Sequence, residues 1–277
     1  MAHREEIERG DRFGFGANWS KFVGLLSQDR INAAEKSLCE LLNVNTLRGK
    51  SLLDIGSGSG LFSLAAKRLG AKVHSFDYDC QSVRCTQELK WRFFKEDREW
   101  AIEEGSVLDV EFLERLGSFD VVYSWGVLHH TGEMWRALDN VVRSVRLDGA
   151  LCLAIYNDQG WISKYWLVVK RIYNRSTVGR TAIIMLHAPY LFGLRYLIRA
   201  LTGRLSGERG MSLWYDMIDW LGGYPFEVAK PEAIYKFVEG KGFVLEKLKT
   251  CRGRHGCNEF VFRKSNASAC STSLLQQ

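Results

Sequence analysis

The stretch LLDIGSGSGLFSLAAKRLGAKVHSFDYD, residues 52–79, decides the fold of this chain. It holds an apolar run, a turn made almost wholly of glycine and serine, a helical pattern, and a second apolar run that ends in an acid. This order predicts a strand, a tight turn, a helix and a second strand. Gly56, Gly58 and Gly60 leave the backbone of the turn bare, so a ligand can approach the free N–H groups at the helix start. We therefore predict that a ligand binds at this turn.

The residues around the turn limit what that ligand can be. A dinucleotide site needs the spacing G-x-G-x-x-G, but position 61 is Leu61 and no third glycine falls at the required offset. Asp54, inside the motif, would repel a pyrophosphate and suits a cationic or amine-bearing ligand. Asp77 ends the second apolar run, where a carboxylate can hold a ribose diol. These features together fit S-adenosylmethionine, which carries an ammonium, a sulfonium and a ribose but no phosphate.

Apolar runs alternate with helical patterns along the rest of the chain. The predicted strands are 50–56, 72–77, 103–109, 119–126 and 149–157, and the predicted helices between them are 61–70, 80–94 and 134–146. Such alternation indicates a parallel sheet covered on both faces, with ligands at the carboxyl ends of its strands. Residues 242–250 and 258–264 predict a terminal antiparallel hairpin. The expected fold class is α/β: a doubly wound, Rossmann-like sheet of seven strands with a helical insertion after the fifth.

Composition predicts one globular unit. The chain has 277 residues, of which 46% are hydrophobic and 25% are charged, and its seven cysteines form no C-x-x-C pair. Its first residues are charged and polar, so we expect a cytoplasmic protein. We expect residues 1–48 to form a helical lid segment and residues 49–264 one domain with the insertion at about 160–225. Residues 265–277 are low in complexity and are expected to be disordered.

The net charge of +6 belongs to the insertion. Between Gly160 and Gly210, nine lysines and arginines stand against one acid, Glu208. Apolar and basic residues mix there at helical spacing, and charged residues or proline break every window long enough to span a bilayer. Three interpretations stay open: a lid over the active site, a basic amphipathic surface on an anionic membrane, or an RNA-binding surface. Apolar helix faces argue against a surface made for nucleic acid alone.

Taken together, the successive motifs LDIGSGSG (53–60), GSVLD (105–109), FDVVYSWGVLHH (119–130) and RLDGALCLAIYN (146–157) resemble the class I S-adenosylmethionine-dependent methyltransferases. The subgroup most similar in pattern is the ubiquinone-biosynthesis O-methyltransferases of the UbiG type. By that resemblance, Gly56, Gly58, Gly60 and Asp54 form the turn that holds the cofactor, and Asp77 binds its ribose hydroxyls. The other cofactor residues that it implies are Arg30, for the methionine carboxylate, Ser106 and Val107, beside the adenine, and Leu128, after the fourth strand.

Two adjacent histidines after the fourth strand are the candidate catalytic residues. Histidine titrates near neutrality, so His130 can accept the proton of an acceptor hydroxyl, with His129 assisting. His130 matches the histidine of the subgroup's "LEH" turn, whereas His129 and Gly126 replace acids that are linked to a divalent metal in some members. We therefore predict no metal site, although two histidines could bind a divalent metal. The Asn/Asp-Pro-Pro-aromatic signature of base-amine methylation is absent, which favours an oxygen acceptor without excluding nitrogen or sulfur.

The sequence thus predicts a methyltransferase that acts on a small or lipid-like acceptor, with nucleic acid disfavoured. Tyr156, Asn157 and Trp161 follow the fifth strand and are expected on the acceptor side. The aromatic-rich segments 12–19 and 209–232, the second containing the turn LGGYP, are expected to fold back on the acceptor pocket. Two further interpretations remain: a tRNA-modifying enzyme that docks RNA on the insertion, and a partner subunit that binds the cofactor without catalysis.

Overall fold

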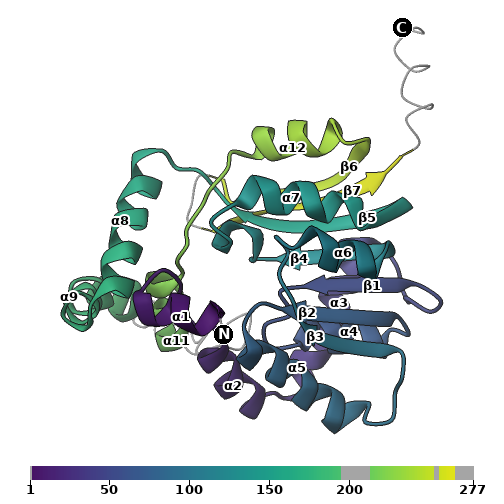
Figure 1. The fold of residues 1–277 in the computed structure, drawn as a ribbon, viewed down its shortest axis with the longest axis horizontal. Helices are drawn as coiled ribbons and strands as arrows, with labels where there is room; N and C mark the ends of the chain where they lie inside the picture. The colour runs from purple at the N-terminus through teal and green to yellow at the C-terminus, as the bar shows by residue number, and fades with distance from the viewer. Residues whose placement is uncertain (1, 195–212, 253–255, 266–277) are drawn as a thin grey trace, which may run out of the picture.

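The computed structural model describes residues 2–194, 213–252 and 256–265, which form a seven-stranded sheet with helices on both faces (Figure 1). The strands are β1 (Ser51–Ile55), β2 (Lys72–Asp77), β3 (Trp100–Glu104), β4 (Phe119–Trp125), β5 (Val145–Tyr156), β6 (Phe243–Lys249) and β7 (Cys257–Lys264). The helices are α1 (Ala2–Arg9), α2 (Gly16–Gly24), α3 (Gln28–Leu42), α4 (Leu61–Arg68), α5 (Cys80–Phe93), α6 (Val110–Leu116), α7 (Met134–Arg143), α8 (Trp161–Arg175), α9 (Thr177–Ala188), α11 (Leu213–Gly222) and α12 (Pro231–Glu239), with a short 3-10 helix η1 (Leu128–His130) and a π-helix η2 (Pro189–Leu194).

The strand order is β3-β2-β1-β4-β5-β7-β6, which confirms the predicted doubly wound sheet and terminal hairpin. Strands β1 to β5 are parallel, and β7 runs antiparallel to both β5 and β6. The chain reverses its direction of winding between β1 and β4. In such sheets the crevice at this switch point, at the carboxyl ends of the strands, is where ligands bind.

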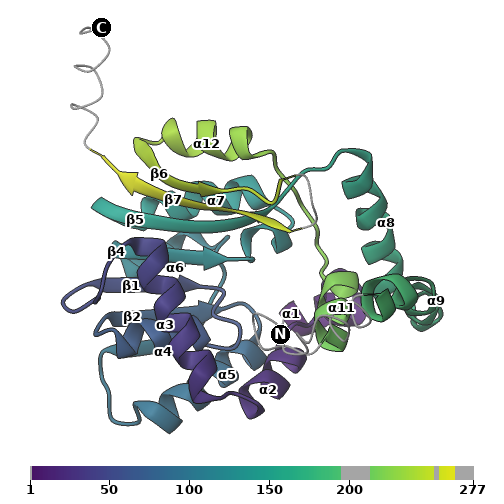
Figure 2. The ribbon, with the colours of Figure 1, turned by 180° about the vertical axis from the view of Figure 1, so that it is seen from behind.

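Side chains alternate between the two faces of the central strands. Leu52 and Val121 pack toward α3, α4 and α5, whereas Leu53 and Val122 pack toward α6, α7 and α12. Figure 2, seen from behind, shows α3 and α4 covering the face opposite to α6 and α7. Because both faces are buried, the strands are apolar almost throughout. Helix α3, in the predicted lid segment, packs into this body through Ile31 and Leu38, and α2 joins the same apolar cluster through Val23.

Two predicted boundaries were wrong. Strand β3 was expected at 103–109 but spans Trp100–Glu104, with the Trp100 side chain fully buried. The acid at the end of that prediction starts a helix instead: Asp109 accepts a hydrogen bond of 3.0 Å from the backbone N–H of Phe112 and caps α6. Strand β5 begins at Val145, four residues earlier than expected, and passes through Asp148 with a φ of +58°.

The insertion after the fifth strand is helical, as predicted, in the residues that the structure describes. Helices α8, α9 and α11 lie at the outer end of the molecule, away from the sheet (Figures 1 and 2). They share a third apolar cluster of Trp166, Val169, Tyr173, Ile183, Leu191, Met217, Leu221 and Phe226. No helix in the described part of the chain is long and apolar enough to cross a membrane. Residues 195–212 of the insertion and 266–277 of the predicted tail lie outside the described residues.

A buried polar network lies under the glycine-rich turn and joins four elements. Ser63, on α4, donates a hydrogen bond to the Asp54 carboxylate on β1 and lies 2.7 Å from the hydroxyl of Ser75 on β2. The indole N–H of Trp100, on β3, donates to Ser75 at 2.9 Å. Because burial makes an unpaired polar group costly, this network fixes α4 and the turn against three strands.

We expect Ser75→Ala to lower the free energy of unfolding by about 1–3 kcal/mol, because the buried Trp100 N–H and Ser63 hydroxyl lose a shared partner. Urea unfolding followed by circular dichroism measures this. The exposed Ser118→Ala is the matched control and should change stability by less than about 0.5 kcal/mol. Equal effects of the two substitutions would contradict the structural role of the network.

Candidate active site

The turn between β1 and α4 requires glycine for two physical reasons. Gly56 and Gly58 have φ of +72° and +55°, in the left-handed region that other residues rarely adopt. A Cβ on Gly56 would lie 2.5 Å from the side chain of Val127, and one on Gly58 would lie 3.2 Å from the indole of Trp19. The bare backbone of the turn is therefore closely covered, by the loop after β4 on one side and by α2 on the other.

Asp77 lies directly against this turn. The backbone N–H of Gly58 donates to its Oδ2 at 2.9 Å, and the N–H of Asp79 donates to its Oδ1 at 2.9 Å. Burial raises the pKa of Asp77 to about 7, with the neighbouring carboxylates of Asp79 and Asp54 acting in the same direction and the two hydrogen bonds acting against it. The two N–H bonds leave each carboxylate oxygen a lone pair, so the half-buried side chain can still accept hydrogen bonds from a diol.

Asp54 lies beneath the turn rather than in its wall. Its side chain is buried and accepts the hydrogen bond from Ser63, and burial raises its pKa to about 6. With Asp77 and Asp79 it gives this part of the site three acidic groups. Such a cluster disfavours a phosphate and favours a ligand that carries positive charge.

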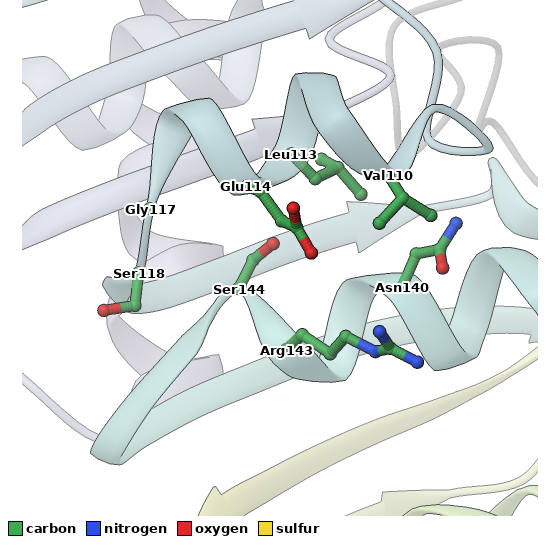
Figure 3. A pocket seen from close by; sticks show the side chains of 8 residues that line it. All are labelled: Val110, Leu113, Glu114, Gly117, Ser118, Asn140, Arg143 and Ser144. Carbon is green, nitrogen blue, oxygen red and sulfur yellow. The ribbon is translucent and has the colours of Figure 1, made fainter.

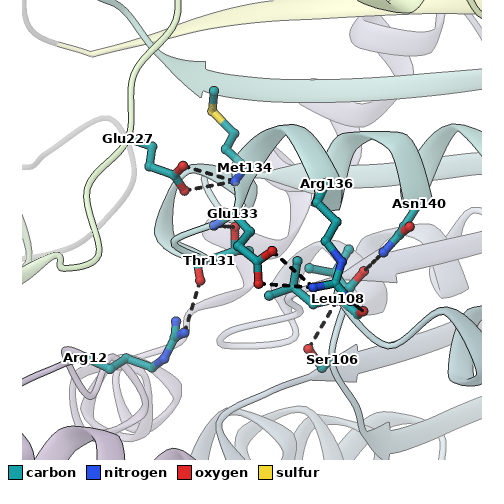
Figure 4. A network of polar contacts seen from close by, with 10 residues as sticks. Arg12, Ser106, Leu108, Thr131, Glu133, Met134, Arg136, Asn140 and Glu227 are labelled. Carbon is teal, nitrogen blue, oxygen red and sulfur yellow. Dashed lines mark hydrogen bonds and ion pairs between the residues drawn. The ribbon is translucent and has the colours of Figure 1, made fainter.

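The loop after β3 follows the glycine-rich turn and Asp77 as the third element on this side of the site. The backbone N–H of Gly105 donates to the carbonyl of Asp77 at 3.0 Å, which places the following residues beside the strand end. Ser106 accepts a bond from Leu108 N–H, and the carbonyl of Val107 accepts one from the Asn140 amide at 3.0 Å (Figure 4). The turn thus contacts Asp77 directly, and Ser106 and Val107 follow the residue that bonds to the Asp77 carbonyl.

Two predicted cofactor residues do not join this group. The guanidinium of Arg30 donates to the Leu25 carbonyl at 2.7 Å and lies 5.5 Å from the Phe22 ring, on the outer side of α2. Leu128 is fully buried in the core, and its carbonyl accepts a bond from the Thr131 hydroxyl. In this arrangement neither side chain lines the turn.

The N-terminal segment contacts both the Asp79 side and the His130 side of the site. Asp79, which caps α5 through Gln81, also accepts a hydrogen bond of 2.8 Å from the N–H of Gly16 at the start of α2. Between α1 and α2, Arg12 donates to the carbonyl of His130 at 2.6 Å and to that of Thr131 (Figure 4). Segment 12–19 therefore folds over the strand ends, as its aromatic composition suggested.

His130 is held in one tautomer. Its Nδ1 lies 2.7 Å from the carbonyl of Pro225, which can only accept, so Nδ1 carries the proton and Nε2 keeps its lone pair. A Cβ on Gly223 would lie 2.9 Å from the ring carbon beside Nε2. Both contacts come from the LGGYP turn, so this part of the predicted segment 209–232 folds back against His130, while residues 209–212 lie outside the described residues. Burial, with the charges of Lys170 and Arg12, lowers the pKa of His130 to about 3 against the opposite effect of the Pro225 hydrogen bond.

His129 is also neutral. The backbone N–H of Tyr156 donates to its Nδ1 at 3.3 Å, and the two ring centres are 3.9 Å apart. Burial holds the pKa of His129 well below its usual range, and His130 and Lys170 act in the same direction. At neutral pH His130 can therefore accept a hydrogen bond at Nε2, whereas the acceptor nitrogen of His129 is already used by the Tyr156 N–H, and neither imidazole is a strong base.

Rings surround the histidine pair on the acceptor side. Tyr156 contacts Trp220 and Phe226 at ring distances of 5.5 and 5.4 Å, and Phe15 lies 5.0 Å from His130. Of the other predicted acceptor residues, Asn157 accepts a bond from the amide of Asn258 at 3.0 Å. Trp161 is 76% exposed at the start of α8.

Sequence reasoning expected segment 12–19 at the site without assigning contacts to Arg12 and Trp19, and it missed Asp79 and Lys170, which act through contacts distant in sequence. A hollow of about 290 Å³ between α6 and α7, lined by residues such as Gly117, Asn140 and Ser144, lies near the amino ends of β4 and β5 (Figure 3). It is therefore remote from the strand ends that carry the site.

Among the described residues, no three His, Cys, Asp or Glu side chains are grouped to hold a metal ion.

Comparison with known proteins finds relatives and solved structures that are methyltransferases. Residues 53–153 match a family model described as a methyltransferase domain. A ribosomal protein L11 methyltransferase of Macrococcus caseolyticus is 26% identical over 195 residues, 58% of this chain and 61% of that protein. One from Legionella pneumophila (strain Lens) is 48% identical over 56 residues, 20% of this chain and 19% of that protein. The chain thus spans less than two thirds of the length of these curated relatives.

Solved structures share the fold at low sequence identity. The magnesium protoporphyrin IX methyltransferase of Synechocystis PCC 6803 with bound SAH has a TM-score of 0.55 and 15% identity, covering 94% of this chain and 100% of that one. An O-methyltransferase family protein of Burkholderia thailandensis has a TM-score of 0.52 and 14% identity, covering 91% and 60%. Residues 53–153 therefore match a methyltransferase domain, and the sheet has the fold of these solved methyltransferase structures.

The raised pKa of Asp54 has a measurable consequence. Between pH 4 and 6 the folded protein keeps a proton on Asp54 that the unfolded chain, with its ordinary pKa of 3.8, releases. The contribution of Asp54 to the free energy of unfolding is thus fully present below pH 4 and is lost as pH rises to about 6. Asp54→Asn removes this loss. We expect the variant to gain about 3 kcal/mol relative to the parent between pH 4 and pH 7, measured by urea unfolding at each pH. A pH-independent difference would contradict the assigned burial of the charge.

Proposed function

We propose that this chain transfers a methyl group from S-adenosylmethionine to an oxygen atom of a small or lipid-like acceptor. The observation that carries the proposal is the carboxylate of Asp77, fixed at 2.9 Å by the N–H of Gly58 beside two further acids. A phosphate-free ligand with a diol and positive charge is complementary to this arrangement.

The residues present fit this cofactor. The turn Gly56–Gly60 would hold it closely, Asp77 would accept hydrogen bonds from its ribose hydroxyls, and Ser106 and Val107 would border its adenine. Bound S-adenosylmethionine supplies an electrophilic methyl group on a sulfonium. Arg30 would reach the methionine carboxylate only by leaving the Leu25 carbonyl.

On the acceptor side, His130 would receive a hydrogen bond at Nε2 and so orient the acceptor oxygen for in-line attack. Tyr156 and the neighbouring rings would exclude water and pack against an apolar acceptor. The resemblance to the UbiG-type O-methyltransferases supports an oxygen acceptor. The names of the L11 methyltransferase relatives favour a second candidate, methylation of a protein.

We expect Asp77→Asn to weaken binding of S-adenosylmethionine by about 10- to 100-fold, because a charged acceptor of ribose hydrogen bonds is lost. Isothermal titration calorimetry on the full chain measures this. Asp139→Asn makes the same chemical change on the outer side of α7 and should leave the affinity unchanged. If wild-type protein fails to bind, or if both variants bind alike, the proposed donor site is wrong.

His130→Ala separates an enzyme from a cofactor-binding partner subunit. The lowered pKa of His130 argues against its predicted role as a general base, so we expect methyl transfer to fall by about 10²-fold, through loss of the group that orients the acceptor oxygen, while cofactor affinity is kept. The assay uses labelled S-adenosylmethionine and a cell extract separated into RNA, protein, lipid and polar fractions. Label in lipid or polar metabolites supports the proposal, whereas label in protein or RNA moves the acceptor to that class. Activity that survives the substitution excludes a catalytic role for His130.

The outward face of α8 supports a membrane-peripheral location. Trp161, Tyr165, Val168 and Ile172 are 76, 44, 53 and 44% exposed and recur at helical spacing on one side. The exposed residues Lys164, Arg171 and Arg175 flank this stripe. An apolar ridge with a basic edge suits the surface of an anionic bilayer, where a lipid-like acceptor would be found.

We expect the protein to co-sediment with vesicles of phosphatidylglycerol and phosphatidylcholine, and less so as salt is added. The triple substitution Trp161→Ser, Val168→Ser, Ile172→Ser should weaken this binding by about tenfold or more, since three apolar side chains no longer enter the interface. Trp91→Ser, at a residue 61% exposed on α5, is the control. Equal binding to pure phosphatidylcholine, or an unaffected triple variant, argues against this surface.

A further inference from the structure

Lys170 is a buried cation that the mechanism above leaves without a role. It lies on the inner face of α8 and is 0% exposed. Its ammonium donates to the carbonyl of Trp220 and lies 4.4 Å from the centre of the Trp220 ring and 4.8 Å from that of Phe226. Burial lowers its pKa to about 7, against the opposite effect of the Asp219 carboxylate. A desolvated ammonium costs free energy that an apolar residue would avoid.

The contacts of Lys170 lie at one structural point, the end of α11. The last four carbonyls of a helix have no partner within it. The Asp219 carbonyl accepts from the N–H of Gly223 at 2.9 Å, and that of Trp220 accepts from Lys170. The carbonyl of Gly222 accepts from the Asn174 amide at 2.7 Å. Lys170 and Asn174, one turn apart on α8, therefore cap α11 from another helix, and a cation there also suits the helix dipole.

This capped end leads directly into the turn that holds His130. Gly223 packs against the His130 ring, and the carbonyl of Pro225 accepts its Nδ1 proton at 2.7 Å. The Lys170 ammonium also lies over the ring of Phe226, which packs on Tyr156. Of the other charged groups nearby, Arg12 is paired with Glu6, and Glu227 accepts from Met134 N–H. Only α8 thus supplies side-chain hydrogen bonds to the last carbonyls of α11 among the contacts described.

We propose that Lys170 and Asn174 are positioning residues, which clamp the end of α11 and thereby fix the ring orientation and tautomer of His130. The insertion then has a second role besides covering the site: it completes the histidine arrangement. The catalytic meaning of this clamp rests on the proposed function, whereas the positioning itself can be tested without any substrate.

The test is the side-chain ¹⁵N spectrum of His130 in the full chain at pH 7.5, assigned with His130→Gln. Wild-type protein should show one species protonated at Nδ1. Lys170→Met, which keeps the length of the side chain but removes the donor, should give mixed or exchange-broadened tautomers. Asn174→Ala, which removes the second donor, should act in the same direction and serves if the Met variant does not fold.

Lys67→Met is the matched control. Lys67, on α4, is also buried, but it bonds to the Ala71 carbonyl and to Asp97. It should lower stability and leave the His130 spectrum unchanged. A wild-type-like His130 spectrum in Lys170→Met or Asn174→Ala overturns the proposal, as does an equal change in Lys67→Met. If the proposed function also holds, Lys170→Met should lose about tenfold or more in methyl transfer at unchanged cofactor affinity. If the variants lose the single tautomer but the wild-type protein transfers no methyl group, the proposed function is wrong and the positioning role stands.

Discussion

The rest of the site depends on one hydrogen bond, from the backbone N–H of Gly58 to the carboxylate of Asp77. It joins the bare turn after β1 to the end of β2, and it requires a turn conformation that only glycine adopts without strain. Trp19 packs on the same turn, and Asp79, two residues beyond Asp77, anchors α2 through Gly16. The covering helices are therefore positioned by the same strand end that forms the proposed ribose contact.

The two halves of the site differ in charge. Around the turn, three acidic groups stand close together, and their burial raises the pKa values of Asp54 and Asp77. Around the histidine pair, burial lowers the pKa of both imidazoles, and the charge of Lys170, joined by Arg12 at His130, acts in the same direction, so both stay neutral. A cationic donor and an electron-rich acceptor would each meet complementary surroundings, on opposite sides of the switch point between β1 and β4.

Helix α8 has two distinct faces. Its inner face carries Trp166, Lys170 and Asn174 and holds α11 in place. Its outer face carries an exposed apolar ridge with a basic edge, for which burial in the body of the protein gives no explanation. One helix can therefore connect a surface contact to the position of His130, because both faces move with the same backbone.

The sequence by itself determined the parallel sheet, the bare turn and the place of Asp77, because period, glycine spacing and strand ends are local properties. It also located the histidine pair and the folding back of LGGYP. It did not determine where β3 ends, since capping of α6 by Asp109 competes with strand pairing over the same residues. Nor did it show that Asp54 lies beneath the turn, that His130 is neutral, or that Lys170 caps α11. Those facts were decided by tertiary structure alone, because burial and contacts between distant segments set charge and tautomer, as between His130 and Pro225, 95 residues apart, and between His130 and Arg12, 118 residues apart.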